Sequence, residues 1–80
     1  MDRVNSVSIV LPTAEAAKEF VRVVSGYPYE MDLRSGRYVV DAKSILGILS
    51  LDHEQGMRLD VYADDIADLL SDLATFIAGE

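Results

Sequence analysis

The chain has 80 residues, half of them hydrophobic, with no cysteine, one histidine and a formal net charge of -7. Residues 1–80 are expected to form a single domain with one modest core. The excess of acidic residues argues against direct nucleic-acid binding. The lack of cysteine excludes disulfide and thiol chemistry. No apolar run approaches the roughly 18 residues that cross a membrane and the N-terminus lacks a signal-peptide pattern, so we expect a cytoplasmic protein without membrane insertion.

The N-terminal part of the chain predicts a strand followed by a helix. Apolar and polar residues alternate from Ser6 to Leu11, which is the period of a strand with one face on a core, and Pro12 ends it. The hydroxyl of Thr13 can cap the next helix, and Gly26 stops it. Between these two residues the apolar side chains recur at helical spacing, at Ala17, Phe20, Val21 and Val24.

A hairpin, a short helix and a fourth strand are predicted next. The alternating segment Tyr29–Arg34 and the β-rich segment Arg37–Val40 flank a serine-glycine turn, which favours two antiparallel strands. Ser44 opens an apolar helix of about two turns, in which Gly47 allows another element to approach closely. After a polar loop, Met57–Tyr62 alternates again and predicts the last strand.

The C-terminal segment predicts an amphipathic helix that begins at Asp64 or Asp65. Its apolar stripe comprises Ile66, Leu69, Leu70, Leu73, Phe76 and Ile77. The acidic residues of the last third are interpreted as a solvated helix face, and they are Asp60, Asp64, Asp65, Asp68 and Asp72. The element order βαββαβα predicts an α+β fold in which an antiparallel sheet is covered on one face by helices.

The segment Lys43–Leu51 closely resembles the second-helix segment of HPr, the small histidine phosphocarrier of the bacterial sugar phosphotransferase system, in its Gram-positive form. The resemblance extends through Phe20, the Gly26-Tyr27 step, the Ser35-Gly36 turn and the Gln55-Gly56 turn. The chain is therefore identified as a divergent member of the HPr family. This implies an HPr-like open-faced β-sandwich of four antiparallel strands and three helices, in agreement with the element order.

The chain departs from the family pattern at the phosphocarrier site. The resemblance places Thr13 at the position of the carrier histidine and Glu15 at that of the arginine beside the phosphate. A phosphorylated threonine is a low-energy ester that does not pass its group onward, and a carboxylate at position 15 repels phosphate. The one histidine of the chain, His53, lies elsewhere, in the loop after the second helix. We therefore expect that phosphate transfer through histidine is lost.

Nothing else in the sequence indicates an enzyme. The chain has no pattern of a nucleophile with its base, no glycine-rich phosphate loop and no zinc spacing, so we expect no catalytic residues and no cofactor. Asp64 and Asp68 lie one helical turn apart, yet they lack a second group of oxygen ligands, so no metal site is expected. A lone His53 in a polar loop is interpreted as an exposed, solvated side chain.

Ser44 is the candidate regulatory phosphorylation site. The resemblance implies that an HPr kinase phosphorylates it and that the modified protein is a corepressor partner of a catabolite control transcription factor. A phosphate there would meet backbone N–H groups and the positive end of the helix dipole. Neighbours in the short apolar helix diverge by about 100° around its axis, so some must be exposed. The expected partner-binding residues are Lys43, Ile45, Leu46, Ile48 and Leu49.

These observations give one hypothesis and two alternatives. The first is a regulatory protein-interaction module of the phosphotransferase system family, linked to carbon catabolite repression and switched at Ser44. Glu15 would alter the surface that meets the transcription factor, because the matching arginine contributes to partner contacts in relatives. The alternatives are a phosphocarrier component with an atypical site, for which acid-labile labelling would implicate His53, and an HPr-fold binding scaffold with neither modification. For Thr13 and Ser44, the competing interpretation is a helix cap alone.

Overall fold

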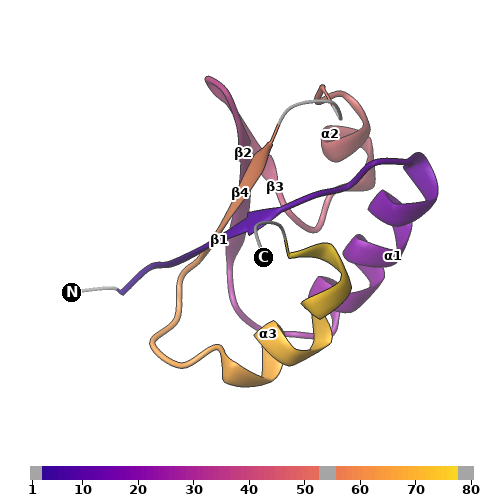
Figure 1. The fold of residues 1–80 in the computed structure, drawn as a ribbon. Coiled ribbons are helices and arrows are strands. Elements are labelled where there is room, and N and C mark those ends of the chain that lie inside the picture. Colours follow the sequence, from indigo (N-terminus) through magenta and orange to yellow (C-terminus); the bar gives the residue numbers. More distant parts are fainter. Residues whose placement is uncertain (1–2, 53–55, 78–80) are drawn as a thin grey trace.

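The computed structural model describes residues 3–52 and 56–77, which form a four-stranded antiparallel sheet with three α-helices on one face (Figure 1). The strands lie in the order β1-β4-β2-β3 and comprise β1 (Asn5–Ile9), β2 (Met31–Ser35), β3 (Tyr38–Asp41) and β4 (Met57–Val61). The helices are α1 (Ala14–Ser25), α2 (Ile45–Leu49) and α3 (Ala67–Asp72), and a 3-10 helix, η1 (Ala74–Phe76), follows α3. The predicted α+β open-faced β-sandwich is confirmed.

The strand register gathers apolar side chains on the face that the helices cover. Val7, Leu59, Leu33 and Val40 lie side by side across β1, β4, β2 and β3. Side chains alternate along a strand, so the residues between them point to the opposite, open face. That open face carries Ser6, Ser8, Asp32, Arg34, Arg58 and Asp60.

Two glycines have the roles that the sequence indicated. Gly36 has a φ of 61° in the hairpin turn between β2 and β3, a conformation that favours glycine over other residues. Gly47 lets α2 lie directly against β3, since a Cβ added there would come 3.1 Å from the Cβ of Val40. The predicted close approach at Gly47 is therefore confirmed.

The C-terminal segment differs from the prediction. Helix α3 begins at Ala67 rather than at Asp64 or Asp65, because the Asp65 carboxylate accepts a hydrogen bond from the Ala67 N–H (3.1 Å) and holds a turn before the helix. The chain then tightens into η1, and Ile77 forms an antiparallel bridge with Ile9 beside β1. The apolar stripe therefore continues past α3 as the chain bends back toward the sheet, where the Phe76 ring packs edge-on against Phe20.

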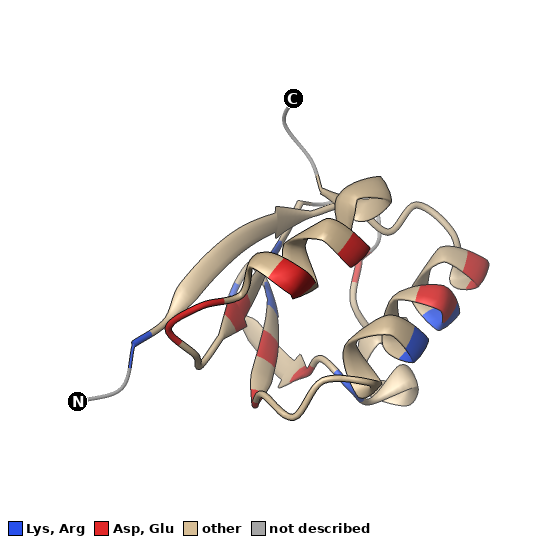
Figure 2. Cartoon of the chain, turned by 90° about the horizontal axis from the view of Figure 1, so that it is seen from below, with Lys and Arg blue, Asp and Glu red and all other residues tan. Residues whose placement is uncertain are grey.

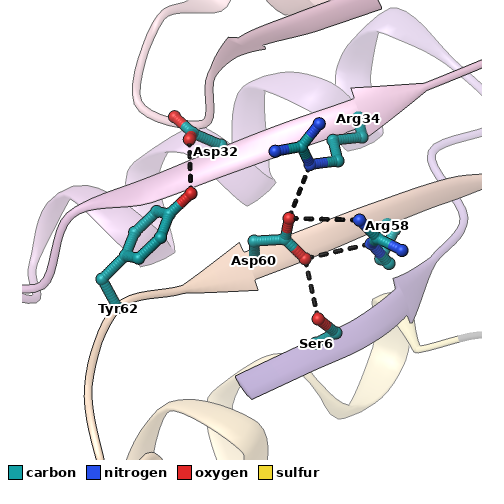
Figure 3. Close-up of polar contacts among 6 residues, drawn as sticks. All are labelled: Ser6, Asp32, Arg34, Arg58, Asp60 and Tyr62. Carbon is teal, nitrogen blue, oxygen red and sulfur yellow. Dashed lines mark hydrogen bonds and ion pairs between the residues drawn. The ribbon is translucent and has the colours of Figure 1, made fainter. Parts of the chain in front are cut away.

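The interpretation of Asp60 as part of a solvated helix face is wrong. Asp60 lies in β4 on the open face of the sheet and is 4% exposed. Its carboxylate accepts hydrogen bonds from Ser6 Oγ (2.8 Å), Arg34 Nε (2.6 Å) and Arg58 Nε (3.0 Å), which come from three strands (Figure 3). Burial raises the pKa of Asp60, but the hydrogen bonds outweigh burial and hold it below its ordinary value.

We expect Asp60→Asn to lower the free energy of unfolding at neutral pH by about 1–3 kcal/mol, because the amide loses hydrogen bonds between charged groups. The pKa of Asp60 is depressed in the folded state, so its stabilisation is present above about pH 4 and is lost as the pH falls through the folded-state value. The wild type should therefore lose stability more steeply in acid than the variant. Urea unfolding followed by circular dichroism at a series of pH values measures both effects.

Asp64→Asn is the matched control for this prediction. Asp64 is exposed and its carboxylate lies 3.7 Å from the exposed Arg3, a pair that contributes at most about 1 kcal/mol. Equal losses of stability in the Asp60 and Asp64 variants would contradict a special contribution from the buried carboxylate.

Candidate functional site

The start of α1 is capped by the residue that the sequence placed at the carrier position. Thr13 is extended, with φ -136° and ψ 164°, and its Oγ1 accepts a hydrogen bond from the Ala16 N–H at 3.0 Å. Its carbonyl accepts a further hydrogen bond from the Ala17 N–H at 3.1 Å. The predicted helix cap is confirmed, so the Thr13 hydroxyl stabilises the first turn of α1.

Glu15 adds a negative charge to this first turn. Its side chain is exposed, and its Oε2 lies 4.0 Å from Nζ of Lys18 on the same helix. A carboxylate at this end of α1 suits the positive end of the helix dipole. A phosphate placed here would meet like charge from Glu15, whereas a guanidinium would attract it. His53 lies outside the described residues.

Ser44 caps α2 with both its side chain and its backbone. Its Oγ accepts a hydrogen bond from the Gly47 N–H (3.2 Å), and its carbonyl accepts one from the Ile48 N–H (3.0 Å). Its own N–H donates to the carbonyl of Asp41 at the end of β3 (3.0 Å). The predicted role of Ser44 in opening the helix is confirmed. The side chain is half-buried, and a serine hydroxyl keeps one donor proton while it accepts.

Lys43 precedes Ser44, but its ammonium is held by another part of the chain. Lys43 Nζ donates to the carbonyl of Tyr27 (2.7 Å), which follows the end of α1. Its N–H donates to Oδ1 of Asp41 (2.9 Å). A cation close to the C-terminal end of α1 is favourable because of the helix dipole. Lys43 therefore joins the start of α2 to the end of α1.

Helix α2 buries one side and exposes the other, as its apolar composition required. Leu46 is 79% exposed and Leu49 is 38% exposed, whereas Ile48 is fully buried and Ile45 is half-buried. The expectation that Ile48 belongs to a partner-binding face is wrong, because its side chain is part of the core. We call Ser44, Leu46 and Leu49 the α2 surface; the two leucines, three positions apart, lie on the same side of the helix.

Charge is distributed unevenly over the rest of the surface. Figure 2 shows only acidic residues along α3 and the segment before it, whereas α1 and the strands carry residues of both signs. Within residues 3–52 and 56–77, no three histidine, aspartate or glutamate side chains are grouped so that they could hold a metal ion. In the same part of the chain, no helix has both the length and the apolar character needed to cross a membrane.

Two groups of contacts were not predicted from the sequence. The first is the set of hydrogen bonds that Ser6, Arg34 and Arg58 donate to the Asp60 carboxylate. The sequence feature that could have indicated it is that these residues occupy outward-facing positions on neighbouring strands. The second centres on Tyr27, whose hydroxyl donates to Asp72 of α3 and whose carbonyl accepts from Lys43. The hydrogen bond to Asp72 raises the pKa of Tyr27 to about 12. Apart from Arg58, which is two positions from Asp60 in β4, the partners lie far apart in the sequence, so no local pattern indicates these contacts.

Residues 12–78 match the family model PTS-HPr, described as the PTS HPr component phosphorylation site. The match covers most of the chain, so this protein belongs to the PTS HPr family of phosphocarrier proteins, and the predicted family is confirmed. HPr is a phosphocarrier protein and not a catalytic enzyme. No curated protein matches the chain.

Solved structures of HPr proteins share the fold of this chain. HPr-C-His from Thermoanaerobacter tengcongensis is 23% identical, with a TM-score of 0.69, and the match covers 91% of this chain and 88% of that one. The phosphocarrier protein HPr of Bacillus anthracis str. Ames is 22% identical, with a TM-score of 0.71 and coverage of 96% and 98%. A histidine-containing phosphocarrier protein of mycoplasma is 12% identical, with a TM-score of 0.70 and coverage of 91% and 89%. At these identities the likeness shows the fold.

We expect Thr13→Ala to lower the free energy of unfolding by about 1 kcal/mol, because the Ala16 N–H loses its side-chain acceptor. Thr13→Ser keeps a hydroxyl that can accept the same bond, so it should stay close to the wild type. Chemical denaturation followed by circular dichroism compares the three proteins. If the serine variant were as unstable as the alanine variant, the hydroxyl could not be the source of the stabilisation.

Proposed function

We propose that this chain is a regulatory protein-interaction module of the HPr family, which does not carry phosphate on histidine and is switched by phosphorylation of Ser44. The observation that carries the proposal is the large exposure of Leu46 on the same short helix that Ser44 caps. An exposed apolar side chain beside a modifiable hydroxyl gives a docking surface whose charge can be changed. The module acts in the cytoplasm through contacts with other proteins.

The start of α1 supports the loss of histidine phosphotransfer. A phosphate on an imidazole nitrogen transfers readily because the ring leaves as a neutral base. The Thr13 hydroxyl is instead used as a helix cap, and its phosphate ester would have no comparable leaving group. Glu15 adds repulsion at the place where a phosphate would be held.

The α2 surface supports the switch at Ser44. A phosphate adds a charge of about -1.5 to -2 and three acceptor oxygens to a position that already bonds the Gly47 N–H. Lys43 is the adjacent cation, although its ammonium donates to the Tyr27 carbonyl at 2.7 Å and so would have to rearrange to pair with the phosphate. A matching partner needs an apolar pocket for Leu46 and basic residues for the phosphate. We propose an HPr kinase as the modifying enzyme and a catabolite control transcription factor as that partner.

The proposal predicts phosphorylation of Ser44 by an HPr kinase with ATP, and no labelling by the general phosphotransferase enzyme with phosphoenolpyruvate. Intact mass and site mapping of the purified chain measure both reactions. Ser44→Ala should abolish the modification. Ser50→Ala is the matched control, because Ser50 is an exposed serine at the other end of α2. The Ser50→Ala variant should be phosphorylated at Ser44 like the wild type.

A positive control makes the phosphoenolpyruvate reaction informative. The double variant Thr13→His, Glu15→Arg restores the side chains expected of a phosphocarrier and should gain an acid-labile phosphate. An acid-labile phosphate on the wild-type chain would contradict the proposal and favour a phosphocarrier with an atypical site at His53. No modification of the wild type in either reaction would also contradict it, and would leave a binding scaffold of the HPr fold.

The α2 surface can be tested separately from the phosphate. We expect Leu46→Glu to weaken binding of the Ser44-phosphorylated chain to the transcription factor by at least about tenfold, because a central apolar anchor becomes charged. Fluorescence anisotropy of the labelled chain measures the dissociation constant. Val4→Glu is the matched control, since Val4 is also exposed but precedes β1, and it should bind like the wild type. Equal weakening in both variants would point to charge alone rather than to the α2 surface.

A further inference from the structure

The two edges of the sheet differ in how far other parts of the chain cover them. On the β1 edge, Ile9 forms a bridge with Ile77, and the Val10 N–H donates to the Phe76 carbonyl at 2.7 Å. On the β3 edge, no strand within residues 3–52 and 56–77 pairs beyond β3 (Figure 1). An open edge strand can pair with another chain, and proteins hinder such pairing with short strands, charges, proline or bulges. Strand β3 has neither lysine nor proline, but it has only four residues and ends at Asp41.

The outward side of β3 presents backbone groups that can bond. The Ala42 N–H donates a hydrogen bond to the Met31 carbonyl (3.1 Å). This bond shows which alternate residues of β3 form backbone hydrogen bonds with β2. Successive residues of an antiparallel strand direct their backbone groups to opposite sides. Val40 therefore bonds toward β2, whereas Val39 and Asp41 direct their N–H groups away from it. Val39 also directs its carbonyl to this open side.

The side chains along this edge complement their own reversed sequence. Residues 37–41 read Arg-Tyr-Val-Val-Asp; β3 begins at Tyr38, and Arg37 is the turn residue directly before it. An antiparallel pairing that places Val39 opposite Val39 therefore brings Arg37 at the end of each turn next to Asp41 of the other copy. The same register sets Tyr38 opposite Val40. Pairs of opposite charge and pairs of an aromatic with a β-branched residue both stabilise neighbouring antiparallel strands.

The surfaces that this register brings together are apolar and exposed. Tyr38 is 67% exposed, and Val39 is also exposed on the opposite face of the strand. A groove of about 620 Å³ lies beside β3, and its lining includes Val40 together with Ser50 and Leu51 at the end of α2. In the pairing described, Tyr38 of a second copy comes opposite Val40, next to this groove.

We propose that β3 is a self-association edge, at which two copies of this chain pair antiparallel about a two-fold axis through Val39. The pairing joins the two sheets into one and forms the same contacts in both directions, as a two-fold interface requires. The side chain of Asp41 lies on the open face of the joined sheet, where Arg37 of the other copy's hairpin turn comes next to it, and those of Tyr38 and Val40 lie on the helix-covered face.

The association is weak because the interface is small. A four-residue strand buries less area than the roughly 1,200 Å² of a stable interface, and two chains of charge -7 repel each other. The dimer is therefore to be sought at millimolar chain concentration and at physiological ionic strength, where the net repulsion is screened.

A charge-swap experiment tests the register. Arg37→Asp and Asp41→Arg each place like charges opposite one another in a homodimer, so each should raise the dissociation constant by about tenfold or more. In an equimolar mixture of the two variants, opposite charges face each other again at both ends, so association should return. Sedimentation velocity measures all three samples, and circular dichroism checks that each variant is folded. Arg3→Asp changes the net charge as Arg37→Asp does, so it is the control for that variant and should associate like the wild type.

A second variant tests the backbone pairing without changing charge. Val39→Pro removes an N–H that faces away from β2, so the hairpin keeps its internal bonds while the edge loses its central donor. It should abolish association. A wild type that stays monomeric at millimolar concentration would overturn the proposal. Association that persists in Val39→Pro, or a mixture of the charge variants that associates no better than either alone, would overturn it as well.

Discussion

The structure depends on the fact that a chain this short can cover only one face of its sheet. A domain of this size buries roughly 60% of the surface that its unfolded chain exposes, and the helices within residues 3–52 and 56–77 form one layer on one face of the sheet (Figure 1). The helix-covered face takes the apolar residues of every strand, such as Leu33 and Leu59. The open face must therefore satisfy its own polar groups, and it does so by surrounding the Asp60 carboxylate with Ser6, Arg34 and Arg58.

The same constraint explains why α2 is short and yet well positioned. A five-residue helix has little stability of its own, because helix nucleation is costly. It is held instead by buried Ile48, by the contact of Gly47 with Val40, and by the hydrogen bond from Lys43 to Tyr27. Once this side of α2 is fixed, Leu46 has to point outward. The candidate docking surface is thus a consequence of how the helix is anchored.

Family membership and site chemistry are separate questions in this protein. The match to the HPr family and the shared fold identify the architecture and the class of phosphocarrier proteins. A fold supports many functions, so the chemistry depends on the side chains at the site. At the start of α1 those side chains are the hydroxyl of Thr13, which caps the helix, and the exposed carboxylate of Glu15. The proposed function takes these two residues as the counterparts of the carrier histidine and its arginine, and neither has the leaving group or the cation that histidine phosphotransfer uses.

The sequence by itself determined the elements whose signals are local. Alternation marked the strands, helical spacing marked α1, and the capping hydroxyls of Thr13 and Ser44 marked where two helices begin. Tertiary structure decided the rest, because periodicity states which side of an element is apolar but not what covers it. In the folded chain Asp60 is buried beside arginines from two strands. Ile48 lies in the core whereas Leu46 is exposed, and the chain after α3 bends toward β1. Each of these outcomes depends on contacts between residues that the sequence keeps apart or on the packing of a whole face.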